Sequence, residues 1–381
     1  MTDIKKHKHI VFGFEHYNPL GIVRSLGEKN IEPIGIIIKC DRPITSKSKY
    51  LKKVHFVSNI EEGYQVLLTV YGNENEKPFI YTSDDQITSF LDHKYDELID
   101  KFYFFNAGKQ GGINHYMDKY NICEMAKKHG IPVAKTWAVS RGEIPSDLIY
   151  PIITKAIVST IDNWKQDSII CNNEAELKKA YETIASERVL LQQYIFKKNE
   201  LCLDGFVSPH GKETVVTIAS VYNYIIPDSY SHYMTIDNLK DDELYRKVSE
   251  MFREIGFTGI FSLELLVGPN DEYYFLEVNF RNSTWSYAST VVGMPLPELW
   301  AESVIKGSVD HSSLTRIDKP FTAMVEFDDF RARVKGKKIG LIQWLKDFKN
   351  CKVKFYYVKN DLKPICSVIT AKFKRMTGRK K

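Results

Sequence analysis

Two strand-like segments joined by a short turn constrain the fold of this chain more than any other feature. The segments are GIFSLELLVG (residues 259–268) and EYYFLEVNFR (residues 272–281), and Pro-Asn-Asp at 269–271 favours a tight turn. Successive side chains of a strand point to opposite faces. We therefore expect an antiparallel hairpin with an apolar face, which includes Val278 and Phe280, and a polar face.

The polar face of this hairpin carries residues that suit phosphoryl chemistry. With the turn centred on residues 270–271, Glu264 lies across from Glu277 and Ser262 lies across from Asn279, and Arg281 shares the face of Glu277 and Asn279. Like charges directly opposite on a sheet are destabilising. Two carboxylates and an amide oxygen suit Mg²⁺, with Mn²⁺ as the alternative ion, and the arginine would stabilise charge on a transferred phosphoryl group. The competing interpretation is a solvated face that carries two acids by chance.

The hairpin sequence resembles the metal-binding end of the ATP-grasp ligases. The similarity rests on LEVNFR, preceded by GFTGIFSLELLV and followed by a segment ending in VVGMPLPELW. It extends from about residue 10 to about residue 364 and is closest to carboxylate-amine ligases of the D-aspartate ligase type. The resemblance implies an α/β fold, α+β in the catalytic lobes, in which a Rossmann-like parallel-sheet domain precedes two lobes that clasp ATP. It also implies that Glu264, Glu277 and Asn279 bind Mg²⁺ and that Arg281 is catalytic.

Length and composition agree with a folded enzyme of two or three domains. The chain has 381 residues and a net charge of +5, which gives no strong case for nucleic acid as a partner. Its six cysteines form no CxxC pair and predict reduced thiols in a cytoplasmic protein. With the resemblance, we expect four segments: an N-terminal Rossmann-like domain (1–112), a central region with the small nucleotide-binding lobe (113–196), a catalytic lobe with the hairpin (197–319) and a small C-terminal module (320–381).

The C-terminal tail is strongly basic. From residue 372 the sequence KFKRMTGRKK contains no acid, and it could hold the chain peripherally on an anionic inner membrane surface. The more common role of such an end is a frayed, solubilising tail. No stretch of the sequence is apolar for long enough to span a bilayer.

The first hundred residues alternate between strand-like and helical segments. HIVFGF, EPIGIII, KKVHFV, PFIYTS and KFYFFN predict strands, and residues 19–29, 60–71 and 84–91 predict helices, which together favour a parallel sheet covered by helices. The GxGxxG fingerprint is missing, so a nicotinamide-dependent oxidoreductase is disfavoured. The resemblance makes this domain one wall of the substrate site, with Glu15 and His16 as substrate contacts; the alternative is that both are ordinary loop residues.

Two lysines are candidates for binding the phosphates of ATP. Lys119 begins a helix predicted at 118–129, and Lys155 stands in the apolar strand YPIITKAIVST, where a cation is costly unless it is paired or faces an anion. The resemblance assigns both lysines to the nucleotide phosphates. The chain departs from the usual family pattern at residues 159–163, where Ser-Thr-Ile-Asp-Asn replaces a glycine-rich loop.

The strand VLLQQYI, which follows a helix predicted at 174–185, is expected to join the two lobes. By the resemblance, the backbone of Gln193, Tyr194 and Ile195 meets the adenine, Gln192 stands where an acid often binds the ribose, and Glu200 lies near the nucleotide. The alternative for the two glutamines is an ordinary half-exposed strand.

The segment after the hairpin supplies the remaining candidates. In the family this stretch contacts the acceptor substrate, and the candidate residues are Asn282, Ser283, Ser286 and Tyr287.

These observations favour an ATP-dependent ligase. Such an enzyme converts a carboxylate to an acyl phosphate and joins it to an amine, with release of ADP and phosphate. The resemblance to the D-aspartate ligase type implies small-molecule substrates or a cell-envelope precursor to which an amino acid is joined. The main alternative is a non-catalytic, membrane-associated scaffold that binds ATP. Both lysines and the Glu, Glu, Asn, Arg set argue for catalysis.

Overall fold

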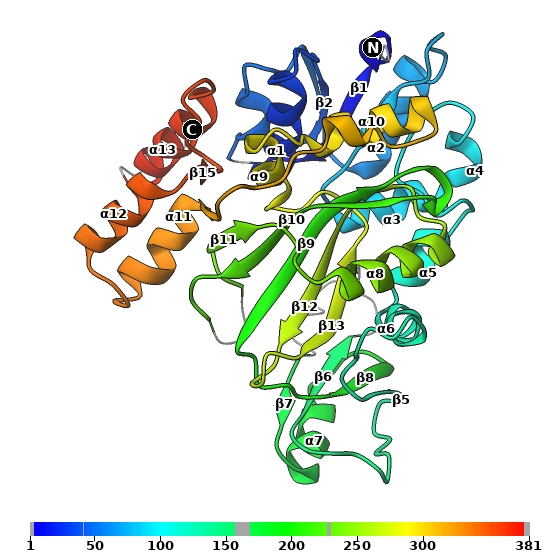
Figure 1. The fold of residues 1–381 in the computed structure, drawn as a ribbon, viewed down its shortest axis with the longest axis vertical. Helices are drawn as coiled ribbons and strands as arrows, with labels where there is room; N and C mark the ends of the chain where they lie inside the picture. Colours follow the sequence, from blue (N-terminus) through cyan, green and yellow to red (C-terminus); the bar gives the residue numbers. More distant parts are fainter. Residues whose placement is uncertain (1–3, 41, 157–167, 227–229, 377–381) are drawn as a thin grey trace.

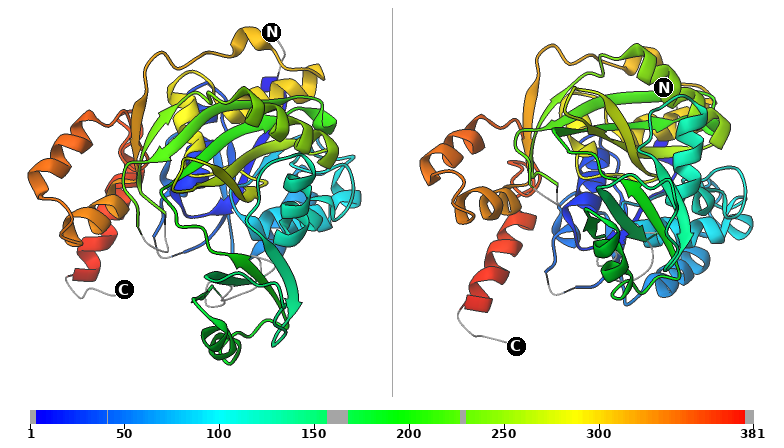
Figure 2. Two further views of the ribbon diagram at one scale, coloured as in Figure 1. Left: turned by 60° about the horizontal axis from the view of Figure 1, so that its bottom comes forward. Right: turned by 90° about the horizontal axis from the view of Figure 1, so that it is seen from below.

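The computed structural model describes residues 4–40, 42–156, 168–226 and 230–376, which form three β-sheets (Figure 1). A seven-stranded sheet lies between an N-terminal parallel sheet and a small four-stranded lobe, and the C-terminal helices form an arm at one side (Figures 1 and 2). The predicted α/β architecture with a parallel-sheet N-terminal domain is confirmed. The proposed phosphate loop at 159–163 lies outside the described residues.

The N-terminal sheet is fully parallel, with the strand order β3-β2-β1-β4. Its strands β1 and β2 are nearly continuous apolar runs because helices cover both faces. The strand order reverses between β1 and β4, and a crevice forms where adjacent strands lead in opposite directions. The elements are β1 (His9–Phe14), α1 (Tyr17–Gly27), β2 (Ile34–Ile38), β3 (Lys53–Val57), α2 (Ile60–Val66), β4 (Phe79–Tyr81), α3 (Asp85–His93) and α4 (Tyr95–Leu98).

The prediction that KFYFFN (residues 101–106) forms a fifth strand is wrong. Only Tyr103 forms an isolated parallel bridge, to Phe79 of β4. Three residues later, Asn106 pairs instead with Thr258, at the start of the seven-stranded sheet. The segment therefore crosses from one sheet to the other: Phe102 and Phe104 are buried in the core of the N-terminal domain, and Phe105 is buried in the core shared with the large sheet.

The small lobe is an antiparallel sheet of order β5-β8-β6-β7 with one helix packed on it. Helices α5 (Gly112–Met117) and α6 (Lys119–Lys128) lead into it, and its strands are β5 (Thr136–Ser140), β6 (Ile152–Ala156), β7 (Ile170–Cys171) and β8 (Arg188–Gln193). Helix α7 (Glu174–Tyr181) begins at the cap of Asn173 but ends four residues before the predicted end, because the chain tightens into a turn at Thr183.

The large sheet has the order β13-β12-β9-β10-β11-β14-β15. One of its faces packs against helices: Phe261, Leu263 and Leu265 of β12 are fully buried in the same core as α8 and α10. The intervening Glu264 therefore points to the opposite face. The elements are β9 (Asn199–Val207), β10 (Thr214–Tyr222), β11 (Tyr233–Asp237), α8 (Asp242–Ile255), β12 (Gly259–Val267), β13 (Tyr273–Asn279), α9 (Ser286–Val291), α10 (Leu296–Lys306), β14 (Phe321–Met324) and β15 (Val353–Lys354).

The residues after 320 share this sheet rather than standing apart from it, since β14 and β15 form its far edge. They also carry the helices α11 (Glu326–Asp329), α12 (Leu341–Asn350) and α13 (Lys363–Met376). Arg24 of α1 and Asp361 form a fully buried ion pair, with Nε and Oδ2 3.0 Å apart, which ties this segment to the N-terminal domain. The four segment boundaries expected from the sequence remain predictions.

All six cysteines are free thiols, as expected. In the described part of the chain, no helix is long and apolar enough to cross a membrane.

Candidate functional site

The β12–β13 hairpin has the predicted register. Glu264 pairs with Glu277 and Ser262 with Asn279, and the turn closes where Asp271 adopts a positive φ of 66°. The side-chain nitrogen Nδ2 of Asn279 lies 3.1 Å from Oε1 of Glu264 and 3.4 Å from Oε1 of Glu277. The three side chains therefore converge on one face, although a bulge after Glu264 shifts the rest of the ladder.

The two carboxylates of this cluster fit a hard divalent cation, whereas Asn279 turns its Nδ2 toward them and its Oδ1 toward Arg281, so its amide would have to rotate to offer an oxygen. Burial, together with the neighbouring carboxylates of Glu277 and Glu200, raises the pKa of Glu264 well above its usual range. A divalent cation would remove this like-charge repulsion and would accept the carboxylate and amide oxygens as ligands. Glu264, Glu277 and Asn279 are thus the residues that would hold Mg²⁺.

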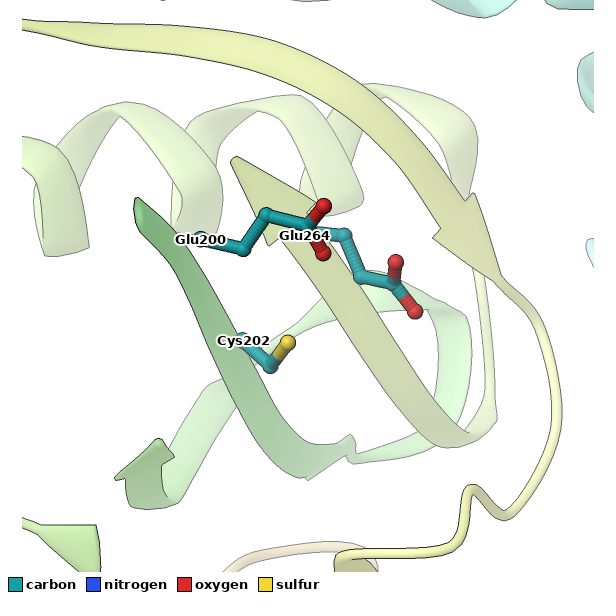
Figure 3. A group of neighbouring side chains, drawn as sticks. All are labelled: Glu200, Cys202 and Glu264. Atoms are coloured by element: carbon teal, nitrogen blue, oxygen red, sulfur yellow. The ribbon is translucent and has the colours of Figure 1, made fainter. Parts of the chain in front are cut away.

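A neighbouring group, Glu200, Cys202 and Glu264, projects from β9 and β12 to the same side (Figure 3). Their candidate ligand atoms all lie within 4.8 Å of one another. The carboxylate of Glu200 is already engaged, because it accepts from Tyr222 Oη at 2.6 Å and from Lys197 Nζ at 2.5 Å. Burial raises the pKa of the Cys202 thiol well above its usual range, so it is a neutral thiol and a poor ligand for Mg²⁺.

Arg281 follows directly after β13 and is clamped by Asp85, the first residue of α3. Nε and Nη2 of Arg281 donate to the two oxygens of Asp85 at 2.7 and 2.9 Å, and Nη2 also donates to Oδ1 of Asn279 at 2.9 Å. Burial opposes the charge of Arg281, but Asp85 outweighs it and raises the pKa of the guanidinium above its usual range. The clamp fixes the arginine beside the metal-binding candidates.

Asp85 was not singled out from the sequence. The available signal was the pair of acids at Asp84 and Asp85, which begins three residues after the end of the apolar strand β4. Asp84 serves a local purpose, since its Oδ1 accepts the backbone NH groups of Gln86 and Ile87 and caps α3. Only the tertiary structure shows that Asp85 reaches Arg281.

The two lysines predicted to bind phosphate both lie near the cluster, since the charge of Glu277 acts on each of them. Burial, reinforced by the charge of Lys119, lowers the pKa of Lys155 to about 8. Burial also lowers the pKa of Lys119, against the attraction of Glu277. Lys119, Glu277 and Asn279 line one small cavity of about 30 Å³. A buried lysine whose charge is disfavoured by a second lysine nearby is arranged as one member of an anion-binding pair would be.

The strand predicted to meet the nucleotide crosses from the small lobe to the large sheet. Oε1 of Gln192 accepts from Lys155 Nζ at 2.8 Å, and Nε2 of Gln192 donates to Thr136 at 3.0 Å, so Gln192 orients the lysine. The backbone NH groups of Gln193 and Tyr194 donate to the carbonyls of Lys135 and Pro151. Ile195 lies half-buried in the same crossing.

A cavity of about 310 Å³ opens beside Arg281, at the carboxyl ends of β1 and β4 where the strand order reverses. Its lining includes Glu15, His16, Asp84, Asp85 and Arg281, so the structure brings both N-terminal candidates to the site. Glu15 is buried, and its Oε2 accepts the backbone NH groups of Ile44 and Ser46 at 2.7 and 3.1 Å. His16 is exposed and caps α1.

The four candidates after the hairpin are not in the lining of this cavity. Ser283 and Ser286 donate to Oδ1 of Asp204 at 2.5 and 2.9 Å, while Asn282 donates to the carbonyl of Ser283. Tyr287 donates to Glu28 at 2.7 Å, away from the hairpin. All four are buried and hold the fold together, so their predicted substrate contacts have no support from the geometry.

Asp204 is a second acid that sequence reasoning missed. It lies on β9 opposite Ser262 and is fully buried. Burial raises its pKa to about 6, although the hydroxyls of Ser283 and Ser286 partly offset this. The signal was an acid at the centre of the apolar run ELCLDGFV.

Comparison with solved structures identifies the fold. Neither a protein-family model nor a curated protein sequence matches the chain. N5-carboxyaminoimidazole synthetase from Staphylococcus aureus superposes with a TM-score of 0.63 at 14% identity, over 87% of this chain and 85% of that one. L-amino acid ligase from Bacillus licheniformis gives 0.63 at 11% identity, over 84% and 80%. Biotin carboxylase from Campylobacter jejuni gives 0.67 at 16%, over 85% and 76%.

The fold is the ATP-grasp fold. The expectation drawn from the hairpin sequence is therefore confirmed at the level of fold. Since the identities are 11% to 16%, the ATP-grasp likeness by itself assigns no substrate to this chain.

Proposed function

We propose that the chain is an ATP-dependent carboxylate-amine ligase that forms an amide bond and releases ADP and phosphate. The convergence of Glu264, Glu277 and Asn279 near Lys119 and Lys155 is the observation that carries this proposal. A metal-binding set facing a pair of cations is what a nucleotide triphosphate requires. Solved neighbours include N5-carboxyaminoimidazole ribonucleotide synthetase with ADP and carboxyaminoimidazole ribonucleotide synthase with ATP, which supports the choice of nucleotide.

The reaction follows from the poor electrophilicity of a carboxylate. An oxygen of the substrate carboxylate attacks the terminal phosphorus of ATP, and the bond to ADP breaks, which leaves an acyl phosphate. The amine then attacks the acyl carbon, loses a proton, and phosphate leaves with the carbon–oxygen bonding pair. Bound Mg²⁺, or Mn²⁺ as the alternative, would supply neutralisation of phosphate charge.

The residues of the chain have separate tasks in this scheme. Lys119 and Lys155 hold the phosphates, and Gln192 orients Lys155. Arg281 stabilises charge on the transferred phosphoryl group, and its Nη1 group faces no hydrogen-bond acceptor among the described residues. The backbone of residues 193–195 and Glu200 remain proposed nucleotide contacts.

The cavity beside Arg281 is the proposed site of the carboxylate substrate. The first turns of α1 and α3 border it, and the amino-terminal end of a helix favours anions. The acids in the cavity lining repel a bound carboxylate only weakly, because each already has a partner. Glu15 accepts backbone NH groups, Asp84 caps α3 and Asp85 pairs with Arg281.

The finer assignment rests on the sequence resemblance. We propose the D-aspartate ligase-like subgroup, with an amino acid joined to a cell-envelope precursor in the cytoplasm. The L-amino acid ligase among the solved neighbours supports an amino acid as a substrate. We also propose that the basic tail from Lys372, of which residues 377–381 lie outside the described chain, contacts the membrane peripherally.

ADP release across a panel of D- and L-amino acids and amines, each with peptide or glycan carboxylates, tests the proposal. We expect release that requires both an acid and an amine, and that falls by about 10² to 10³ in Lys155→Ala and Glu277→Gln. Glu272→Gln, in the turn of the same hairpin, is the matched control and should keep full activity. ATP binding by calorimetry without ADP release from any pair would identify a scaffold and overturn the ligase.

A further inference from the structure

The charge of this chain is divided unequally along its length. Residues 321–381 contain 17 Lys and Arg but five Asp and Glu, so this segment carries +12, whereas the whole chain carries +5. The first 320 residues therefore carry −7. A basic segment attached to an acidic body predicts a local partner that is anionic.

Nearly all acids of the segment are engaged by hydrogen bonds or ion pairs. Glu326 is buried and accepts backbone NH groups of residues 355–357, and Asp361 pairs with Arg24. Asp329 and Asp347 both accept from Arg333. Among the five acids, only Asp328 is left for the surface, and it faces Arg331 at 3.7 Å. The exposed charge of this arm is therefore almost purely positive.

Helix α12 lies at the outer end of the arm and turns one face to the body of the arm (Figures 1 and 2). Trp344 and Phe348 are on this inner face: the indole donates to Asp329 at 2.8 Å and packs edge-on against Phe330. Asp347, one turn after Trp344, contacts Arg333 at 2.7 Å. These contacts fix the rotation of α12 about its axis.

The face of α12 that adjoins this inner face is apolar and exposed. Leu341, Ile342 and Leu345 are 52%, 74% and 49% exposed, and no residue of the helix is buried. Leu345 lies three residues after Ile342 and four after Leu341, and these spacings place the three side chains on one stripe. Lys346 and Lys349 border the same stripe at the next positions of the helix. Three adjacent exposed aliphatic residues beside lysines are the pattern of a helix that lies in a membrane interface.

We propose that α12 docks on the surface of an anionic lipid bilayer, with Leu341, Ile342 and Leu345 among the acyl chains and Lys346 and Lys349 at the headgroups. The aliphatic stripe decides between anionic partners, because a nucleic acid backbone offers no apolar surface to cover it. The surface is distinct from the basic tail and does not depend on the proposed ligase activity.

Co-sedimentation of the full chain with vesicles tests this surface. We expect binding to phosphatidylglycerol-containing vesicles that weakens with salt, and no binding to pure phosphatidylcholine. Lys346→Gln with Lys349→Gln should weaken partitioning about 25-fold, from a factor of about five per lysine. Ile342→Ser with Leu345→Ser should also weaken vesicle binding, and the relative loss should be larger at high salt, where apolar insertion is the main remaining contribution.

Matched variants elsewhere on the surface control for general effects. Lys5→Gln with Lys53→Gln removes two exposed lysines of the N-terminal domain, and Val70→Ser removes a side chain that is 46% exposed. Both should bind vesicles as the unchanged chain does. Thermal unfolding checks that the α12 variants remain folded, which is expected because none of the substituted residues is buried.

Several outcomes would overturn the proposal. These are no binding to anionic vesicles, equal loss in the control variants, or unchanged binding in folded α12 variants. Loss of binding on removal of residues 377–381 alone would assign the contact to the tail instead. Tight binding of a labelled single-stranded RNA that depends on the lysines but not on Ile342 and Leu345 would identify nucleic acid as the partner.

Discussion

Substitution of Asp85 by Asn tests whether this residue acts by positioning Arg281. Asp85 accepts two charge-assisted hydrogen bonds from Arg281, at 2.7 and 2.9 Å. Such bonds contribute about 1.5–3 kcal/mol each. Asn keeps one acceptor, and the side chains of the pair are 16% and 32% exposed, which screens the charge. A net loss of about 1.5–3 kcal/mol corresponds to about 10- to 100-fold in kcat.

The assay is ADP release with the acid and amine pair that the panel identifies. Arg281→Ala removes the charge itself and should cost about 10² to 10³ in kcat, with milder loss of ATP binding. If Asp85 acts through Arg281, introducing Asp85→Asn into the Arg281→Ala variant should cause almost no further loss of kcat. The exposed Asp100→Asn is the control for loss of an acid from the same domain and should be silent. An Asp85→Asn penalty that is equally large with and without Arg281 would refute the positioning role.

Three further predictions follow from buried charges. Because the pKa of Lys155 is about 8, its charge and hence ATP affinity should fall as the pH rises through 8, and Lys155→Arg should flatten this dependence in calorimetric titrations. Burial lowers the pKa of His9 to about 4 from an ordinary 6.5. The neutral imidazole therefore contributes up to about 3 kcal/mol of unfolding free energy above pH 6.5, and this contribution is lost as the pH falls toward 4. Urea unfolding at a series of pH values should show this fall in unfolding free energy, and His9→Gln should reduce it. Asp361→Asn leaves the buried Arg24 without its counter-ion and should cost about 3–5 kcal/mol of unfolding free energy.

Each of these has a contrary outcome. ATP affinity that stays constant up to pH 9 would exclude Lys155 from phosphate binding. Exposed His93→Gln should leave the pH slope unchanged, and an equal effect of both histidine variants would contradict the assignment to His9. If Asp361→Asn were no more harmful than the exposed Asp318→Asn, the buried pair would not join the C-terminal segment to α1.

The hairpin shows what local sequence determines well. The side chains of a strand alternate with a period of two, and a short turn fixes which residues lie opposite. The predicted pairs of Glu264 with Glu277 and of Ser262 with Asn279 are present, but the ladder next to the turn is offset by one residue, and the bulge after Glu264 restores the predicted register. The parallel N-terminal sheet was predictable for a similar reason, since apolar strands alternated with capped helices over short distances.

Local patterns failed where a segment's environment is set by distant partners. KFYFFN is apolar enough to suggest a buried strand, yet its backbone makes hydrogen bonds to two different sheets. The substrate contacts of Ser283 and Ser286 stay predictions from the resemblance, but the sequence nearby did not reveal that Asp204, about 80 residues earlier in the chain, accepts a hydrogen bond from each hydroxyl. Nothing near these segments in the sequence records such partners.

The residue types of the candidate site, their shared face and the parallel sheet before them were determined by the sequence alone, because periodicity and turn chemistry act over a few residues. The tertiary structure alone decided that Asp85 clamps Arg281, that Gln192 orients Lys155, and that the outer stripe of α12 stays uncovered. Those outcomes depend on how separately formed elements pack. Packing is set by the sum of many weak contacts between parts of the chain that are far apart in sequence.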